Sequence, residues 1–226
     1  GNTVREGHVV LIWGGGGGLG SYAIQIVAAA GAIPIAVVSN SQRAEYCSDL
    51  GAIGSIDRSS FEHWGALPHW TDLPGQMKWT AEARRFGRAI WDLLGERKNP
   101  KIVVEHPGEA TLPTSLFVCD TGGMVVICGG TTGYSGSLDL RYHWMRQKRL
   151  QGSHAANFEE ARAFNQMVWD DQIRPTLAET VPWSDLGLAH QRMADNEHLS
   201  GNTAVLVGSS KSGEGAVAER PAYPAR

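Results

Sequence analysis

The residues with the clearest chemical meaning form a glycine-rich stretch near the start of the chain. Five consecutive glycines, Gly14–Gly18, are followed by Leu19 and Gly20. The spacing Gly14-x-x-Gly17-x-x-Gly20 is typical of a dinucleotide-binding turn, because glycines let the backbone approach a pyrophosphate and a following helix N-terminus offers its amides. We therefore predict that Gly14, Gly17, Gly18, Leu19 and Gly20 bind a cofactor. No Gly-Lys-Ser/Thr sequence follows, which argues against a nucleoside triphosphatase.

The end of the next apolar run indicates which dinucleotide is bound. NAD-binding folds place Asp or Glu there to hold the ribose hydroxyls. This chain instead has Val38-Ser39-Asn40-Ser41-Gln42-Arg43. Ser39 and Arg43 can bind a 2′-phosphate, and the Arg43 guanidinium would do so through charge-assisted hydrogen bonds. We therefore predict that the cofactor is NADPH. In the alternative, Arg43 only begins a solvated helix, and Glu45 weakens the local positive field.

A histidine follows another apolar run, at the position where ligands bind to parallel sheets. His106 comes directly after the run that ends at Glu105. Ligands lie at the carboxyl ends of such strands, so His106 is the predicted catalytic residue, facing the nicotinamide and the reacting carbon. The alternative is a histidine that only caps its loop. Cys128 has no neighbouring His or Lys in the sequence, so it is not a predicted nucleophile. The other predicted cofactor-binding residues near strand ends are Arg58, Cys128, Gly129 and Ser153.

The elements that must position these residues follow from the hydrophobic periodicity. We predict six strands, with a further strand near the C-terminus, in the segments 9–13, 33–38, 55–58, 101–108, 122–130, 150–157 and 201–208. Helices are predicted from 21 onward and over 44–50, 80–94, 111–119, 158–170 and 183–194. This alternation predicts an α/β fold, a doubly wound parallel six-stranded sheet of the Rossmann type. A strand before and a helix after the glycines also argue against a flexible linker.

The predicted domain organisation is one NADP-binding domain over residues 1–208, with an insertion at about 59–85 and a disordered tail over 209–226. The aromatic residues of the insertion either cover a partner or bulky ligand or pack on their own domain. A basic and aromatic stretch over 138–149 either holds the phosphates of a large anionic ligand or forms a solvated helix.

The overall composition excludes several functional classes. The net charge of −3 gives no basic footprint for nucleic acid. No apolar run of membrane-spanning length and no signal peptide occur in the sequence. The three cysteines lack metal-ligand spacing and fit a reducing cytoplasm, so we expect no metal site.

Several short motifs, in order, resemble the crotonyl-CoA carboxylase/reductase family of the medium-chain dehydrogenase/reductase superfamily over about residues 3–208. The motifs are Trp13-Gly-Gly-Gly-Gly-Gly-Leu-Gly-Ser-Tyr-Ala, Val38-Ser39, Glu105-His106-Pro107-Gly108, Arg141-Tyr142, Trp144-Met145, Lys148-Arg149 and Gly152-Ser153-His154. The resemblance implies NADPH-driven reduction of an α,β-unsaturated acyl-CoA, with carbon dioxide captured at the α-carbon to give an alkylmalonyl-CoA. It also implies that His106 helps to position the carbon dioxide.

The departures from the family pattern lead to further expectations. The family has an N-terminal catalytic domain that is not in this sequence. We therefore expect the last strand to return to that missing domain, and the chain alone to be inactive. Ala155 stands where the family usually has a bulky aromatic residue, and Cys128-Gly129-Gly130 stands where alanine or serine is common. We predict that Gly130 and Ala155 line a substrate pocket for crotonyl-CoA or a longer or branched enoyl-CoA.

Two alternative functions stay open. One is an enoyl-thioester or quinone reductase that does not carboxylate, and the other is an isolated NADP-binding module without activity. The expected partners are acyl-CoA and carbon dioxide as substrates and further copies of the chain in a dimer or tetramer. Neither nucleic acid nor a membrane is an expected partner.

Overall fold

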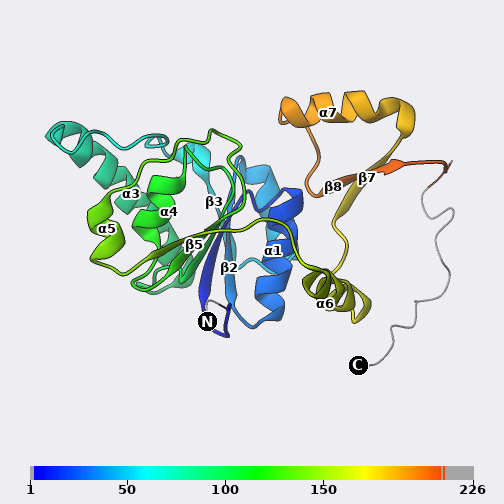
Figure 1. Cartoon of the computed structure of the whole chain (residues 1–226), viewed down its shortest axis with the longest axis horizontal. Coiled ribbons are helices and arrows are strands. Elements are labelled where there is room, and N and C mark those ends of the chain that lie inside the picture. The colour runs from blue at the N-terminus through cyan, green and yellow to red at the C-terminus, as the bar shows by residue number, and fades with distance from the viewer. Residues whose placement is uncertain (1–2, 210, 212–226) are drawn as a thin grey trace. The chain divides into compact units, whose positions relative to one another are not determined.

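The computed structural model describes residues 3–209 and 211, and its contacts divide the chain into two units, Gly1–Pro175 and Thr176–Arg226 (Figure 1). The predicted disordered tail over 209–226 lies, except for residues 209 and 211, outside the described residues.

The first unit is built on a six-stranded sheet with the order β3-β2-β1-β4-β5-β6, and every neighbouring pair is parallel. The strands are β1 Val9–Trp13, β2 Ile33–Val38, β3 Gly54–Asp57, β4 Ile102–Glu105, β5 Met124–Ile127 and β6 Arg149–Gly152. From β1 the chain proceeds outward to β3 and then returns to place β4 on the other side of β1. The position between β1 and β4 is therefore the switch point of the sheet. The doubly wound parallel fold predicted from the sequence is confirmed.

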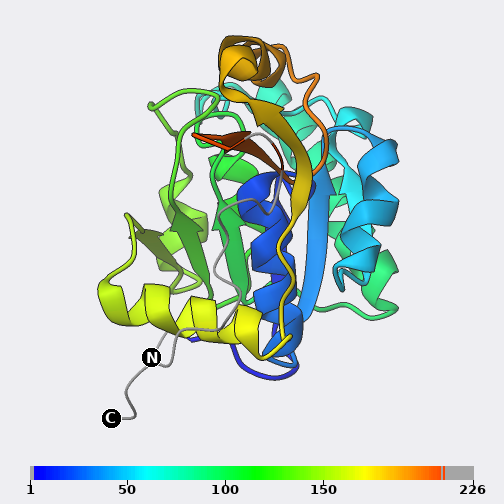
Figure 2. The same ribbon diagram turned by 90° about the vertical axis from the view of Figure 1, so that its right-hand side faces the viewer.

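The central strand β1 is buried on both faces because helices cover the sheet on both sides. Val9, Leu11 and Trp13 point to one core, which is shared with Phe86 and Ile90 of α3 and with Leu112 and Leu116 at α4. Val10 and Ile12 point to the other core, with residues of α1 and α2. The helices are α1 Gly18–Ala29, α2 Ala44–Asp49, α3 Leu73–Leu94, α4 Leu112–Val118, α5 Leu140–Trp144 and α6 Phe158–Trp169. Figure 2 shows α6 crossing near one end of α1. The rings of Tyr22 on α1 and Phe164 on α6 are 5.2 Å apart.

Helix α3 starts earlier than the sequence predicts, at Leu73 and not at Thr80. Pro74 and Gly75 occupy its first turn and resemble a helix breaker, yet proline is well tolerated there because its missing amide has no partner in a first turn. The Asp72 side chain caps this end by accepting a hydrogen bond from the Gly75 amide. About half of the predicted 59–85 insertion, residues 73–85, is therefore helical.

The aromatic residues of the segment before α3 mostly pack on their own domain. The ring of Trp64 lies edge-on to Trp13 at 5.5 Å, and Phe61 lies edge-on to Phe86 at 5.2 Å. Trp70 is the exception, with 72% of its surface exposed. Of the two alternatives for this segment, packing on the same domain describes Phe61 and Trp64.

The second unit contains a parallel pair of strands, β7 Leu177–Pro182 and β8 Asn202–Leu206. Between them lie the short 3-10 helix η3 Trp183–Asp185 and the helix α7 Leu186–Ala194. The strand predicted over 201–208 is confirmed as β8, whereas β7 lies where the sequence indicated only a turn outward. Only Val181 is buried in β7, so its sequence lacks the apolar alternation that identifies a strand.

Candidate functional site

The residues predicted to bind a cofactor or to act in catalysis lie next to the carboxyl ends of the strands of the first unit. One follows each strand closely: Gly14 after β1, Ser39 after β2, Arg58 after β3, His106 after β4, Cys128 after β5 and Ser153 after β6. Because all six strands are parallel, these residues lie along one edge of the sheet. Gly14 and His106 follow β1 and β4, the two strands on either side of the switch point, and this is the place where open parallel sheets bind their ligands.

Two glycines of the turn are required by its backbone geometry. Gly14 has φ +61°, and a Cβ on it would collide with Nε2 of His106. A Cβ on Gly20 would collide with the backbone carbonyl of Gly14. The turn is closed by the Gly17 amide, which donates to the Gly14 carbonyl at 2.9 Å. Gly17 is also the N-cap of α1, and none of the described side chains caps this helix, so its first amides suit a phosphate.

The side chains after β2 fit the 2′-phosphate of an NADP-type cofactor. A Cβ on Gly16 would lie 2.8 Å from Cδ of Arg43, so the Arg43 side chain lies over the glycine turn. Ser39 Oγ and Asn40 Oδ1 are buried and have no hydrogen-bond partner within the described part of the protein. Buried polar atoms are nearly always paired, so these two atoms are well suited to a ligand with phosphate and hydroxyl groups.

His106 lies beside the glycine turn as a neutral imidazole. Burial lowers its pKa, a hydrogen bond to the backbone of Trp13 opposes that effect, and the positive charge of Arg58 lowers the pKa further. The ring contacts Gly14, so it lies beside the glycine turn. A neutral imidazole has a single N–H donor, which the Trp13 backbone accepts here, and its other ring nitrogen is an acceptor.

The fully buried carboxyl of Glu105 joins the parts of the site. It accepts hydrogen bonds from the Gly108 amide at 3.1 Å, from Thr111 Oγ1 at 2.7 Å and from Ser115 Oγ. Ser115 Oγ in turn accepts from Nε1 of Trp13 at 2.7 Å. Glu105 thus links the end of β1, the turn that carries His106 and helix α4. Sequence reasoning missed this role, although a carboxylate at the end of an apolar run was a visible signal.

Glu105→Gln is expected to gain stability relative to the parent chain as the pH rises above 4.5. Burial raises the pKa of Glu105 against the effect of its three hydrogen bonds. The folded state therefore binds this proton more tightly than the unfolded state, and stability is lost as the pH rises from 4.5 through the folded pKa. Gln carries no charge and has no such loss. Urea unfolding of both proteins from pH 4 to 8 measures the difference.

The matched control for this prediction is Glu105→Ala. It leaves three donors without their acceptor and opens a cavity, so it should be about 2–4 kcal/mol less stable than Glu105→Gln at every pH. A constant stability difference between Glu105→Gln and the parent chain over this pH range would contradict the prediction.

The end of β5 leaves little room for side chains next to His106. A Cβ on Gly129 would lie 3.1 Å from the His106 carbonyl oxygen, and one on Gly130 would lie 2.9 Å from the Gly133 carbonyl. The Cys128 amide donates to the Glu105 carbonyl at 3.1 Å. Burial raises the pKa of the Cys128 thiol, so the structure gives no reason to treat this cysteine as a nucleophile.

Ala155 has a left-handed backbone, with φ 56°.

The remaining predicted residues are placed by the same elements. The Ser153 amide donates to the Ile127 carbonyl at 2.8 Å, which fixes the turn after β6 against the end of β5. Gly18 and Leu19 lie in the first turn of α1, and Leu19 is 50% exposed.

The basic stretch over 138–149 does not act as one unit. Arg141 forms an ion pair with Asp139, and Lys148 is buried, with Nζ donating to the carbonyl oxygens of Leu116 and Phe117. Arg146 instead lines a separate cavity. The stretch is therefore neither a single phosphate-binding patch nor a simple solvated helix.

Two kinds of feature are missing from the part of the chain that the structure describes. Within residues 3–209 and 211, no three His, Cys, Asp or Glu side chains are grouped so that they could hold a metal ion. Over the same residues, every helix is too short or too polar to cross a membrane.

Comparisons with known proteins agree with this geometry. Residues 18–170 match the family described as zinc-binding dehydrogenase, although the described residues offer no metal site. The chain is 48% identical over 212 residues to crotonyl-CoA carboxylase/reductase of Cereibacter sphaeroides, covering 94% of this chain and 49% of the relative.

Two solved structures extend the similarity. The crotonyl-CoA carboxylase/reductase AntE in complex with NADP is 55% identical, with a TM-score of 0.91 over 93% of this chain and 52% of that one. The 2-octenoyl-CoA carboxylase reductase CinF, with NADP and 2-octenoyl-CoA, is 34% identical, with a TM-score of 0.81 over 94% and 46%. The chain spans about half the length of these relatives. The chain belongs to the zinc-binding dehydrogenase family, and within it the sequence and the fold are similar to the crotonyl-CoA carboxylase/reductases.

Proposed function

We propose that this chain is the NADPH-binding part of an enzyme that reductively carboxylates an α,β-unsaturated acyl-CoA to an alkylmalonyl-CoA. The observation that carries the proposal is the position of His106, whose neutral ring contacts Gly14 of the dinucleotide-binding turn. Two observations support it: the buried polar atoms of Ser39 and Asn40 have no hydrogen-bond partner among the described residues, and structures of related proteins are complexes with NADP. Gly14, Gly17, Gly18, Leu19 and Gly20 would hold the pyrophosphate, and Ser39 and Arg43 the 2′-phosphate.

The proposed reaction makes specific demands on the protein. NADPH, when bound, supplies a hydride to the β-carbon of the substrate, which leaves an enolate at the α-carbon. His106 would hold a carbon dioxide molecule by exchanging the Trp13 backbone for one oxygen of the molecule as the acceptor of its single N–H, and it would stabilise the negative charge as the carboxylate forms. A neutral ring serves this purpose better than an imidazolium, because a charged acid would protonate the enolate. The Glu105 network holds the turn that positions the ring.

A reductase that protonates the enolate is the second candidate function. Two of the relatives that match this chain, at 22% and 23% identity, are acryloyl-coenzyme A reductases. The Glu105-His106-Pro107-Gly108 sequence favours carboxylation, since a reductase needs an acid and not a neutral histidine at this place.

We expect His106→Ala in the full-length enzyme to shift the product from the carboxylated to the reduced acyl-CoA. The carboxylation rate should fall by roughly 100–1000-fold, the usual effect of removing one donor from a charge-stabilising site, while NADPH oxidation continues. Mass spectrometry of the products with and without bicarbonate gives the ratio. An unchanged ratio would favour the non-carboxylating reductase.

The chain by itself is expected to bind NADPH without turning over crotonyl-CoA, because it spans about half of its relatives. Measuring NADPH binding and turnover with and without the remaining half of the enzyme distinguishes this chain from an isolated binding module. Only a part of an enzyme regains activity when the remaining half is added.

We further propose that Gly130 and Ala155 line the acyl pocket, that the enzyme works in the cytoplasm, and that it forms a dimer or tetramer. The exposed edge strand β6 supports self-association, since edge strands offer unpaired backbone groups.

A further inference from the structure

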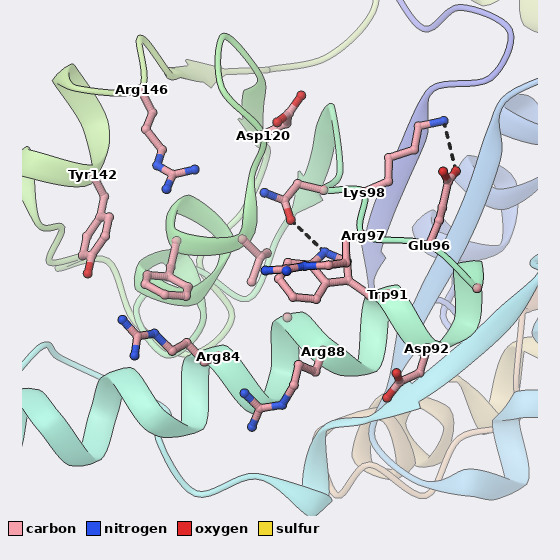
Figure 3. Close-up of a pocket in the computed structure, with 15 residues that line it drawn as sticks. Arg84, Arg88, Trp91, Asp92, Glu96, Arg97, Lys98, Asp120, Tyr142 and Arg146 are labelled. Carbon is pink, nitrogen blue, oxygen red and sulfur yellow. Dashed lines mark hydrogen bonds and ion pairs between the residues drawn. The ribbon is translucent and has the colours of Figure 1, made fainter.

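A small cavity lies at the edge of the sheet opposite to the glycine turn, where the strands of the first unit begin. Its lining includes Arg5 and His8 before β1, Lys101 before β4, Gly122 before β5 and Arg149, the first residue of β6. These four strands are consecutive in the sheet, and the volume of the cavity is about 240 Å³. None of its lining residues belongs to the predicted cofactor site or to the larger cavity that Figure 3 shows.

The lining of this small cavity is basic. It contains four basic residues, Arg5, His8, Lys101 and Arg149, and no carboxylate from the described part of the chain. Asp120 lies 3.5 Å from Lys101, but it lines the larger cavity, and the two side chains are 41% and 37% exposed, so water screens this pair. Cations gathered in one cavity repel one another, and an anion between them removes this repulsion. The charges therefore favour an anionic ligand.

Two of the cations are anchored at the same turn. Lys101 Nζ donates to the Thr121 carbonyl at 2.8 Å, and Arg149 Nη2 donates to the next carbonyl, that of Gly122, at 3.2 Å. A Cβ on Gly122 would meet only Lys101 Nζ, at 3.8 Å, so the turn leaves room beside the ammonium group. An ammonium has three N–H donors, and this hydrogen bond uses one of them. Side chains that are already held in place lose less entropy when a ligand binds.

His8 adds an uncompensated polar atom to the same cavity. Its Nδ1 is buried and has no hydrogen-bond partner within the described residues, although buried polar atoms are nearly always paired. The backbone of His8 is fixed on both sides, because its amide donates to the Arg5 carbonyl at 3.0 Å and its carbonyl accepts from the Ile33 amide at 2.8 Å. In the tautomer with hydrogen on Nδ1, this atom donates to an oxyanion.

We propose that this cavity binds a phosphate-type oxyanion, with Arg5, Lys101 and Arg149 supplying charge-assisted hydrogen bonds and His8 a further donor. The cavity is smaller than the pockets that enclose drug-sized ligands, so it holds free phosphate or only the phosphoryl end of a larger molecule. The site goes beyond the proposed function, because it lies at the opposite edge of the sheet from the NADPH site. A ligand there links the beginnings of four strands and stabilises the folded chain.

The test is calorimetric titration of the chain with inorganic phosphate and, separately, with phenyl phosphate, in a buffer without other oxyanions. We expect one saturable phosphate site. Arg5→Gln combined with Arg149→Gln should weaken phosphate by roughly tenfold or more, because each arginine supplies charge-assisted hydrogen bonds. Equal affinity for phenyl phosphate would assign the site to the phosphoryl end of a larger molecule, and much weaker binding would assign it to free phosphate.

The histidine is tested by a matched pair of variants. His8→Asn, whose amide group can donate in place of Nδ1, should keep most of the phosphate affinity, whereas His8→Leu should lose affinity. Equal affinity in the two variants would remove His8 from the site and overturn the proposed donor set. Phosphate should also raise the thermal unfolding temperature of the parent chain and leave that of the double arginine variant unchanged.

Three controls lie outside the cavity. Lys78→Gln removes a charge from an exposed position of α3, Arg146→Gln alters the larger cavity of Figure 3, and Arg43→Ala alters the glycine turn. A loss in any of them as large as in the double variant overturns the proposal, and so does a parent chain without saturable phosphate binding. Circular dichroism verifies that each variant is folded. Arg5→Gln alone, at an exposed position, should still weaken phosphate if the double variant does not fold.

Discussion

Gly20→Ala is expected to destabilise the chain by about 2–3 kcal/mol, the usual cost of forcing an extra methyl group into a packed site. In most helices the same substitution stabilises, because alanine has the higher helix propensity. Here the sign is reversed, since the new Cβ would collide with the Gly14 carbonyl and lie 2.7 Å from the Gly15 Cα. These are backbone atoms of the turn itself, so relief requires the turn to move. NADPH affinity should fall on the order of 100-fold, which corresponds to about 3 kcal/mol.

Gly17→Ala is the matched control for the glycine turn. Its Cβ would meet only the Gly14 carbonyl oxygen at 3.4 Å, and its φ of −89° is available to any residue. Thermal unfolding should leave its stability within about 0.5 kcal/mol of the parent chain, as at sites without steric conflict. If Gly17→Ala and Gly20→Ala unfolded at the same temperature, the collision at Gly20 would not explain the loss of stability in Gly20→Ala.

Arg43→Ala should remove the preference of the chain for NADPH over NADH. A hydrogen bond to a charged group contributes about 1.5–3 kcal/mol, so NADPH affinity should fall by roughly 10–150-fold while NADH affinity stays unchanged. The structural reason is the position of Arg43 over Gly16, together with the unpaired Ser39 Oγ at the end of β2. Fluorescence titration with both cofactors measures the ratio.

Glu45→Gln provides a control of opposite sign. Glu45 lies in the first turn of α2, two residues after Arg43. Removing its negative charge should raise NADPH affinity slightly and leave NADH affinity alone, because only NADPH carries the extra phosphate. Equal changes for both cofactors in either variant would show that Arg43 holds the turn and does not recognise the 2′-phosphate.

The sequence alone determined the architecture and the edge at which the site lies. Periodicity is a local property, so the apolar run Val9–Trp13, the glycine turn and the following helix were all visible before the fold was known. The parallel order then follows from the alternation of strands and helices, and it places Gly14 and His106 at the ends of two strands. The motifs that resemble the carboxylase/reductases are likewise local in the sequence.

Only the tertiary structure decided how these residues act together, because that depends on contacts between distant segments. Trp13 and Ser115 are 102 positions apart, yet their hydrogen bond links β1 to the Glu105 network. The cavity between α3 and Arg146 likewise arises from packing and not from any one stretch of sequence. Strand β7 escaped prediction because it exists through its pairing with β8, which follows it by some twenty residues. Helix α3 began early because Asp72 caps its first turn, where proline is tolerated.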